Sequence, residues 1–354
     1  MAEIDALLAQ AVALNASDVH VMTGSPPMCR IHGMLEKMGD AEAVTDDLAH
    51  RLFWEMLNDR QREQFEQRRD LDFAYEIPEI GRFRVNIFRQ ARGLGAVLRI
   101  IPRDIMPLES LHLPRAVADF TRLSRGLVLV TGRTGSGKST TLAAMIDYIN
   151  RHRKTHILTI EDPIEFLHAN KLSLINQREV GTHCESFSSA LRSAFREDPD
   201  VILIGEMRDL ETISLAITAA ETGHLVFGTL HTGSAAKTID RMIDVFPTEQ
   251  QSQVRTQLSE SLSSVIAQQL LRRVDGKSRV AAVEILAGVP ALAHLIREGK
   301  TFQISSIIQT GRREGMQTMD QAIVELLKQG QISPEEAYDT CVDRETFHRY
   351  VGKM

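Results

Sequence analysis

Hydrophobic and polar residues follow two different periods in the first hundred residues. Near the N-terminus, apolar residues recur every three or four positions, which predicts a helix, and NASDVHVM then predicts a short strand. Between residues 70 and 101 the pattern alternates, and ARGLG is a turn signal before a second strand, AVLRII. In RFRVNIF the apolar face is Phe83, Val85 and Ile87, and the polar face is Arg82, Arg84 and Asn86. This region is predicted to be a sheet-containing domain.

A different pattern follows. Apolar strands at 127–130, 157–160, 201–204 and 225–230 alternate with stretches of helical period, which predicts a parallel sheet covered on both faces. From residue 249 onward the period is mostly helical. Between the two regions, PRDIMPLESLHLPRAV has three prolines in its first thirteen residues and little period, which is typical of a linker. We therefore expect an N-terminal domain over 1–102, a linker over 103–115 and a second domain over 116–354.

The composition is that of an ordinary globular protein long enough for two domains: 354 residues, 43% hydrophobic and 25% charged. Lys plus Arg total 41 against 47 Asp plus Glu, a net charge of −6, which argues against a nucleic-acid motor. Three widely separated cysteines fit a reduced, cytosolic compartment. No leader-like N-terminus or membrane-length apolar run is evident, so we expect membrane association only through a partner.

The segment LVLVTGRTGSGKSTTLAAMI fits the pattern G-x-x-x-x-G-K-[ST] between a predicted strand and a predicted helix. Its glycines allow successive N–H groups to turn around phosphate oxygens at a helix N-terminus. Lys138 is expected at the β- and γ-phosphates of ATP, and the Ser139 hydroxyl at Mg²⁺. The alternative, a turn that only joins strand to helix, fits less well because every position of the motif is filled. The predicted nucleotide-binding residues are Gly132, Thr134, Gly135, Ser136, Gly137, Lys138, Ser139 and Thr140.

Two carboxylates follow other strands, at the sheet edge where open parallel sheets bind ligands. In THILTIEDPIEF, Glu161 is closest to the strand end and is the candidate that orients the attacking water. The simpler interpretation is a turn at Asp162 with solvated glutamates. In DPDVILIGEMRD, Glu206 is predicted to help hold Mg²⁺, usually through water; the alternative is an ordinary acidic strand cap.

Histidines and arginines complete the candidate site. His231 ends the strand of ETGHLVFGTLHT, where it could contact the γ-phosphate or a carboxylate that senses it, although a lone histidine is more often structural. His224 is the weaker candidate. Phosphoryl transfer also needs a cation against the developing charge. The candidates are Arg82, Arg84 and Arg99 in the first domain, and Arg192 and Arg196 one turn apart on the predicted helix SFSSALRSAFRED, whose expected buried face is Phe187, Ala190, Leu191, Ala194 and Phe195. From the residues alone, a solvated basic face is the simpler interpretation of both sets.

In this order, GRTGSGKST, TIEDPIEF, ILIGEMRD and TGHLVFGTLHT resemble the Walker A, Asp box, Walker B and His box motifs of the secretion ATPase superfamily. The segments GRFRVNIFRQARGLGAVLRIIP, NQREVGT and SSIIQTGRREGMQTMDQAI closely resemble the type IV pilus retraction ATPases, and the resemblance covers nearly the whole chain. It implies a PAS-like α+β N-terminal domain, a RecA-like parallel-sheet P-loop ATPase domain with a helical C-terminal region, and a homohexamer with ATP at the domain and subunit junction.

The resemblance also implies a role and partners. The chain would hydrolyse ATP to depolymerise pilin and drive twitching motility, in the cytoplasm at the inner-membrane base of the pilus machine, with an inner-membrane platform protein and a PilU-like paralogue as partners. Carried over to this sequence, it gives Lys138 and Ser139 the phosphate and Mg²⁺ contacts and Glu161 the catalytic role. It gives Glu206 the Walker B role and His224 and His231 the His box. It favours the arginines as nucleotide contacts, against the interpretation from the residues alone.

Three alternatives compete with this interpretation. An extension ATPase of the pilus or type II secretion systems would be expected to carry a longer N-terminal region and a four-cysteine zinc insertion, and neither is found in the sequence. A PilU-like accessory retraction ATPase shares the motor core. A nucleotide-gated scaffold without turnover would not need both Glu161 and Glu206.

Overall fold

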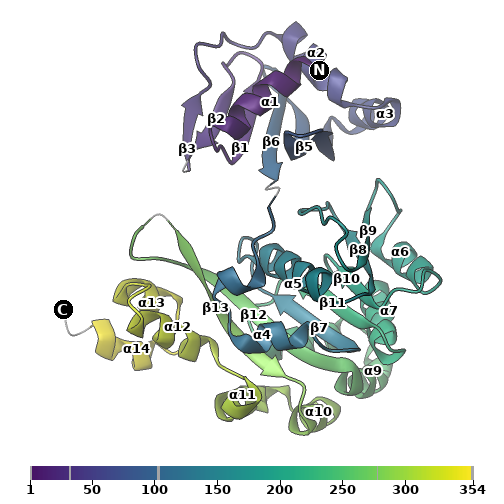
Figure 1. Ribbon diagram of the computed structural model, residues 1–354, viewed down its shortest axis with the longest axis vertical. Helices are drawn as coiled ribbons and strands as arrows, with labels where there is room; N and C mark the ends of the chain where they lie inside the picture. The colour runs from purple at the N-terminus through teal and green to yellow at the C-terminus, as the bar shows by residue number, and fades with distance from the viewer. Residues whose placement is uncertain (1, 32, 102–103, 277, 352–354) are drawn as a thin grey trace. The chain divides into compact units, whose positions relative to one another are not determined.

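The computed structural model describes residues 2–31, 33–101, 104–276 and 278–351, and it divides into two compact units, Met1–Asp104 and Ile105–Met354 (Figure 1). Most of the predicted linker belongs to the second unit. It contains the 3-10 helix η1 (Leu108–Leu111), and Leu108 is buried among core residues of that unit. The sequence did not show this because the prolines obscure any period.

The first unit is an α+β domain with a six-stranded antiparallel sheet in the order β3-β2-β1-β6-β5-β4. Alternation is confirmed in β5, where Phe83, Val85 and Ile87 are fully buried under helical residues such as Phe53. This arrangement is the expected PAS-like one. Its elements are α1 (Glu3–Ala13), β1 (Asp18–Met22), β2 (Met28–Ile31), β3 (Met34–Lys37), α2 (Asp46–Met56), α3 (Asp59–Arg68), β4 (Asp70–Ile77), β5 (Gly81–Gln90) and β6 (Gly93–Ile101).

The second unit is built on a seven-stranded sheet in the order β13-β12-β7-β11-β10-β8-β9, parallel from β12 to β9, with β13 antiparallel to β12. The four predicted strands are confirmed as the central ones. They are β7 (Gly126–Thr131), β8 (His156–Glu161), β10 (Val201–Ile204) and β11 (Leu225–Leu230), and the others are β9 (Leu174–Glu179), β12 (Leu262–Arg272) and β13 (Arg279–Ala287).

The hairpin of β12 and β13 corrects the expectation of mostly helical structure after residue 249. In β12, Leu262, Val265 and Ile266 are spaced as on one face of a helix, and two pairs of polar residues interrupt the strand alternation. Pairing with the central strand β7 overrides this local pattern, because β12 buries its apolar residues on both faces of the sheet.

Helices cover both faces of this sheet, as the buried strands predicted. Leu127 and Leu129 of β7 pack with the helices of one face, and Val128 and Val130 with those of the other. The first face holds α6 (Phe187–Ala194), α7 (Leu210–Glu221), α8 (Ala235–Asp244), α9 (Thr248–Ser261), α10 (Pro290–Arg297) and α11 (Ile304–Thr310), and the second holds α4 (Arg115–Phe120) and α5 (Lys138–His152).

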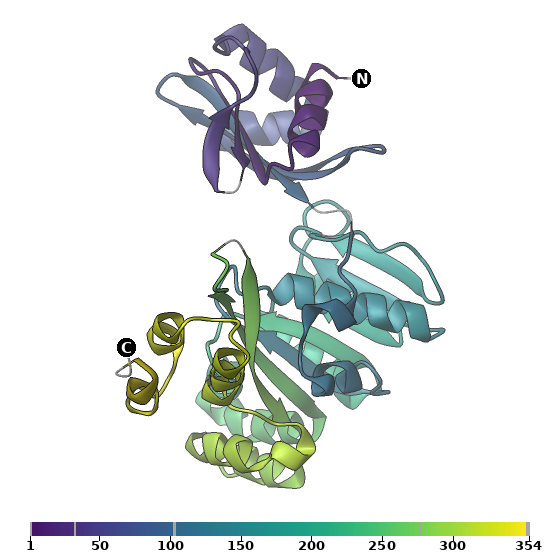
Figure 2. The ribbon, with the colours of Figure 1, turned by 60° about the vertical axis from the view of Figure 1, so that its left-hand side comes forward.

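The C-terminal helices α12 (Met319–Lys328), α13 (Pro334–Thr340) and α14 (Arg344–Val351) pack on the hairpin, as Figure 2 shows in yellow beside green. No helix within the described ranges is long and apolar enough to cross a membrane.

Candidate functional site

The glycine-rich loop joins β7 to α5 at the carboxyl edge of the sheet. Gly135 and Gly137 have φ of 79° and 88°, in the left-handed region that favours glycine. A Cβ on Gly132 would lie 2.3 Å from the Gln268 carbonyl oxygen and 2.4 Å from Ser136 Oγ, so a side chain has no room there. Thr134 is exposed at the loop tip, whereas Thr140 and Ser139 are half-buried at the start of α5. The loop therefore has the backbone shape that the motif requires.

Lys138 is the first residue of α5 and lies buried against the loop. Its Nζ donates to the carbonyl oxygens of Gly132, at 2.8 Å, and Arg133, at 3.2 Å. Burial lowers the pKa of Lys138, opposed by the negative charges of Glu206 and Glu165. The ammonium group is thus held where a phosphate in the loop would meet it.

Beside the loop, a small cavity of about 40 Å³ lies among the ends of three strands and the start of α5. Ser139 comes from α5, Glu161 from the end of β8, Gly205 follows β10, and Thr229 comes from β11. His168, from the segment between β8 and β9, also lines it. A cavity of this volume has room for a water molecule. The cavity brings together the predicted metal and catalytic residues Ser139 and Glu161.

Hydrogen bonds fix the orientation of the Glu161 carboxylate. Its Oε1 accepts from Thr159 Oγ1 at 2.7 Å and from Gln177 Nε2 at 3.3 Å. Burial raises the pKa of Glu161 despite these hydrogen bonds, and the nearby charge of Glu165 acts in the same direction. A carboxylate that is oriented and more basic than usual is suited to accepting a proton from water.

The other predicted carboxylate, Glu206, is contacted by two side chains. Its Oε1 lies 3.0 Å from His231 Nε2, and Arg208 pairs with both carboxylate oxygens at 2.5 Å. Burial would raise the pKa of Glu206, but the Arg208 hydrogen bond and the charges of His231, Arg208 and Lys138 together hold it below its ordinary value. Glu206 therefore stays ionised, and His231 contacts a carboxylate, which is one of the two contacts expected for it.

His224, predicted to bind the nucleotide, lies at the opposite edge of the sheet in this chain. It precedes β11, and its carbonyl oxygen accepts from the Gly126 N–H at the start of β7 at 3.0 Å. The six residues of β11 separate it from His231, about 20 Å at 3.3 Å per residue. His224 therefore lies away from the phosphate loop of its own chain, because the His box motif spans a whole strand, and its part in nucleotide binding stays a prediction.

The predicted arginine helix also needs correction. Its helix α6 ends at Ala194, so Arg196 lies beyond it, and Phe195, expected on the buried face, is 37% exposed with its ring edge-on to His224. Arg192 is an exposed residue of α6 that pairs with Glu211 on α7.

In the first unit, the three candidate arginines form ion pairs with acidic residues of their own sheet. Arg82 lies 3.9 Å from Glu76, and Arg84 lies 3.9 Å from Asp72. Arg99 donates to Asp18 at 2.9 Å. Arg84 and Arg99 are directly opposite each other on β5 and β6. Like charges in such a pair are unfavourable, so this pair concentrates positive charge on one face of the sheet.

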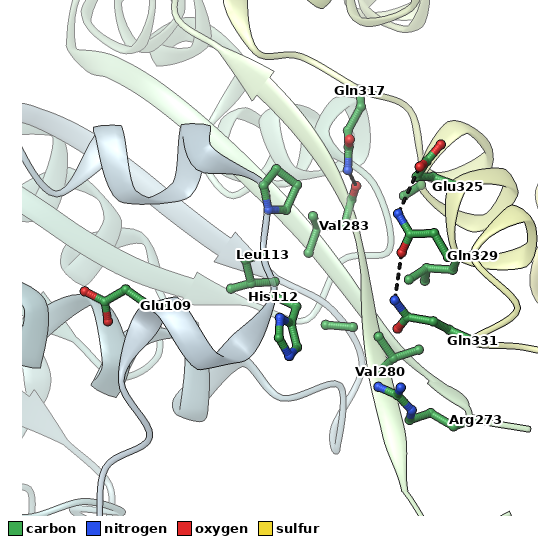
Figure 3. A pocket seen from close by; sticks show the side chains of 14 residues that line it. Glu109, His112, Leu113, Arg273, Val280, Val283, Gln317, Glu325, Gln329 and Gln331 are labelled. Carbon is green, nitrogen blue, oxygen red and sulfur yellow. Dashed lines mark hydrogen bonds between the residues drawn. The ribbon is translucent and has the colours of Figure 1, made fainter. Parts of the chain in front are cut away.

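A larger cavity of about 530 Å³ lies elsewhere in the second unit, between η1, β13 and α12 (Figure 3). Along one wall, Gln331 donates to Gln329 at 2.7 Å and Gln329 donates to Glu325 at 2.9 Å. None of the predicted site residues lines it. The phosphate loop, Glu161 and Glu206 lie instead at the carboxyl edge of the sheet.

Three residues at the site were not singled out from the sequence. Gln177 and His168 belong to the segment around β9, and NQREVGT carried the only signal, as part of a resemblance. Gln268 lies on β12 and contacts the phosphate loop, although it is 127 positions beyond Thr141 in the sequence. It could not be predicted without first predicting that strand.

Comparisons with known proteins agree with this arrangement. Residues 1–342 match the family described as Type II/IV secretion system protein. A Pseudomonas aeruginosa protein named "Type IV pilus retractation ATPase PilT" is 53% identical, over 98% of this chain and 100% of that protein. A second protein of that species, "Type IV pilus ATPase PilU", is 39% identical over 95% and 87% of the two chains. The crystal structure of the pilus retraction motor PilT with bound ADP superposes with a TM-score of 0.91, at 44% identity and 99% coverage of both chains.

Proposed function

This chain belongs to the Type II/IV secretion system protein family, and we propose that it is the ATP-hydrolysing motor that retracts a type IV pilus. The observation that carries the proposal is the convergence of the phosphate loop, Glu161 and the Glu206–His231 pair at one edge of the sheet. The greater identity to the PilT relative than to the PilU relative favours the retraction ATPase over the accessory one.

Each residue of the site has a proposed part. Lys138 and the loop N–H groups bind the phosphates of ATP, with Gly132, Thr134, Gly135, Ser136, Gly137 and Thr140 forming the cradle. Glu161 orients the attacking water and accepts its proton. His231 holds the Glu206 carboxylate in place across the 3.0 Å contact.

The donors at the site also fit Mg²⁺. The Ser139 hydroxyl and the Glu206 carboxylate are the hard oxygen ligands that Mg²⁺ prefers, Glu206 acting through water. Bound there, Mg²⁺ would neutralise charge on the phosphate oxygens.

A homohexamer would bring further cations to each site. Within the loop, Lys138 donates to the loop's own carbonyl oxygens and Arg133 is exposed, while Arg208 is occupied by Glu206. We propose that Arg82, Arg84 and Arg99, with Arg192 and Arg196, are the cations that complete the site in the ring.

The motor is proposed to work in the cytoplasm at the inner-membrane base of the pilus machine. There it would act on an inner-membrane platform protein, alone or beside a PilU-like paralogue. It reaches the membrane through this partner, needs no nucleic acid, and drives pilin depolymerisation and twitching motility.

Two variants and one deletion test the proposal. Lys138→Ala should weaken ATP binding at least tenfold, because a charge-assisted hydrogen bond is worth about 1.5–3 kcal/mol. Glu161→Gln should keep binding and lose turnover, whereas a scaffold without turnover would show no hydrolysis to lose. Deleting the gene should leave cells with excess pili that do not retract, and normal retraction in such cells would refute the motor role.

A further inference from the structure

One buried glutamine outside the recognised motifs contacts the phosphate loop. Gln268, in the middle of β12, is 4% exposed. Its Nε2 donates to the Ser136 carbonyl oxygen at 2.8 Å, and its Oε1 accepts from Thr141 Oγ1 at 2.8 Å. The loop and the first turn of α5 are therefore tied to the same side chain.

The hydrogen bond to Ser136 fixes a donor of the loop. In a trans peptide the C=O of one residue and the N–H of the next point in opposite directions. With the Ser136 C=O directed at Gln268, the Gly137 N–H must point away from β12. Gly137 has φ of 88°, in the left-handed region that favours glycine. Without the hydrogen bond from Gln268, the Ser136–Gly137 peptide would therefore flip more easily than its neighbours.

Packing supports the same conclusion. A Cβ on Gly137 would lie 2.7 Å from Gln268 Nε2, so the glutamine amide fills the space behind this peptide. The backbone oxygen of Gln268 is closer still to the Gly132 position, at 2.3 Å from a Cβ there. One residue of β12 thus supports the loop at both ends.

We propose that Gln268 is a positioning residue for nucleotide binding: it holds the Ser136–Gly137 peptide so that the Gly137 N–H is available to a phosphate oxygen. The inference rests on the proposed phosphate-binding role of the loop. Gln268 does not contact the nucleotide itself. Since ATP and ADP both place a β-phosphate in such a loop, both should depend on it.

The test compares two neighbouring glutamines in the full-length protein. Gln268→Leu removes the anchor, and Gln269→Leu makes the same change at the next residue, whose Nε2 instead donates to Thr340 O at 3.3 Å. We expect Gln268→Leu to weaken binding of ADP with Mg²⁺, measured by calorimetry, by about three- to tenfold, the worth of one neutral hydrogen bond. The KM for ATP should rise by a similar factor with kcat within twofold of wild type, roughly the pattern of lost ground-state binding. Gln269→Leu should bind as the wild type does.

A second variant covers the case in which Gln268→Leu does not fold. Thr141→Val keeps the side-chain shape but removes the hydroxyl that donates a hydrogen bond to Gln268 Oε1. It should also weaken ADP binding, by about twofold. Wild-type affinity in folded Gln268→Leu, or in Thr141→Val if the first variant is unfolded, would overturn the inference. If Gln268→Leu lowers the melting temperature but leaves the affinity for ADP unchanged, Gln268 has a structural role only. Full affinity in Lys138→Ala would instead refute the phosphate-binding role of the loop.

Discussion

Gln177 links the proposed catalytic carboxylate to the segment that covers it. This half-buried residue of β9 accepts from the His168 backbone N–H at 2.8 Å. Its Nε2 donates to the Phe166 carbonyl oxygen at 2.9 Å and to Glu161 Oε1 at 3.3 Å. Replacing Gln177 with Leu should therefore free Glu161 on one side and loosen the segment that holds His168.

The expected magnitude follows from these contacts. A hydrogen bond to an ionised group is worth about 1.5–3 kcal/mol, and the length of 3.3 Å places this one at the weak end. A loss of about 1.4 kcal/mol of transition-state stabilisation lowers kcat roughly tenfold. Thr159 still donates to Glu161 at 2.7 Å, so the loss should stop well short of that in Glu161→Gln. ATP affinity should change by less than about twofold, because Gln177 does not contact the phosphate loop.

Steady-state hydrolysis and equilibrium ATP binding are measured together on three variants. Asn176→Leu, at the exposed neighbouring position of the same strand, is the control and should hydrolyse ATP at the wild-type rate. Thr159→Val combined with Gln177→Leu should lower kcat toward that of Glu161→Gln, since both side-chain donors are then absent. Unchanged kcat in Gln177→Leu, or a loss seen only as weaker ATP binding, would refute this account of how Glu161 is oriented.

Two further predictions concern pH and metal. Burial lowers the pKa of His168 from 6.5 to about 4, so the folded state binds this proton more weakly than the unfolded state. The associated stability is fully present above about pH 6.5 and is lost as the pH falls toward 4, by at most about 3 kcal/mol. In His168→Phe, the free energy of unfolding, measured with denaturant, should depend less on pH in this range. An unchanged pH dependence would contradict the assignment. Hydrolysis should vanish with EDTA and return with Mg²⁺, and stoichiometric zinc in elemental analysis would reopen the extension-ATPase interpretation.

The central part of the site was predictable because each motif is continuous in sequence with a strand. Glu161 ends β8, Glu206 lies just beyond β10, and the loop that leads to Lys138 begins where β7 ends. Parallel strands bring their carboxyl ends to one edge of the sheet. His224 shows the limit of this reasoning. It belongs to the same motif as His231, yet it precedes the strand that His231 follows, so the strand itself carries it to the far edge.

The supporting residues were not predictable for a different reason. Gln268 and Thr141 are neighbours only because β12 pairs with β7, a strand far from it in the sequence. The apolar spacing within β12 favours a helix locally, and only the neighbouring strand makes it a strand. A single sequence records the local preference but not the pairing that overrides it.

The candidate arginines of the first unit all form ion pairs, but they differ in how exposed their side chains are. Exposed ion pairs contribute about 0–1 kcal/mol, so a triphosphate could draw such an arginine from its partner at little cost. Arg84 and its partner Asp72 have side chains 43% and 58% exposed. The Arg82 side chain is only 11% exposed, so its removal leaves a gap in packing as well as a missing charge. Sequence treats the two arginines as equivalent, but their burial does not.

This difference gives a test of the ring. Arg84→Ala should lower ATP turnover while leaving the melting temperature near that of the wild type, whereas Arg82→Ala should lower both. Activity per subunit should rise with protein concentration in step with hexamer formation, because in the proposed ring the arginine acts on a neighbour's nucleotide. Mixing Arg84→Ala with Glu161→Gln should then restore part of the hydrolysis, because some junctions combine an intact arginine from one subunit with an intact Glu161 from the next. A fully active monomer, or no recovery in a mixture shown by mass to contain both variants in one ring, would refute an arginine acting between subunits.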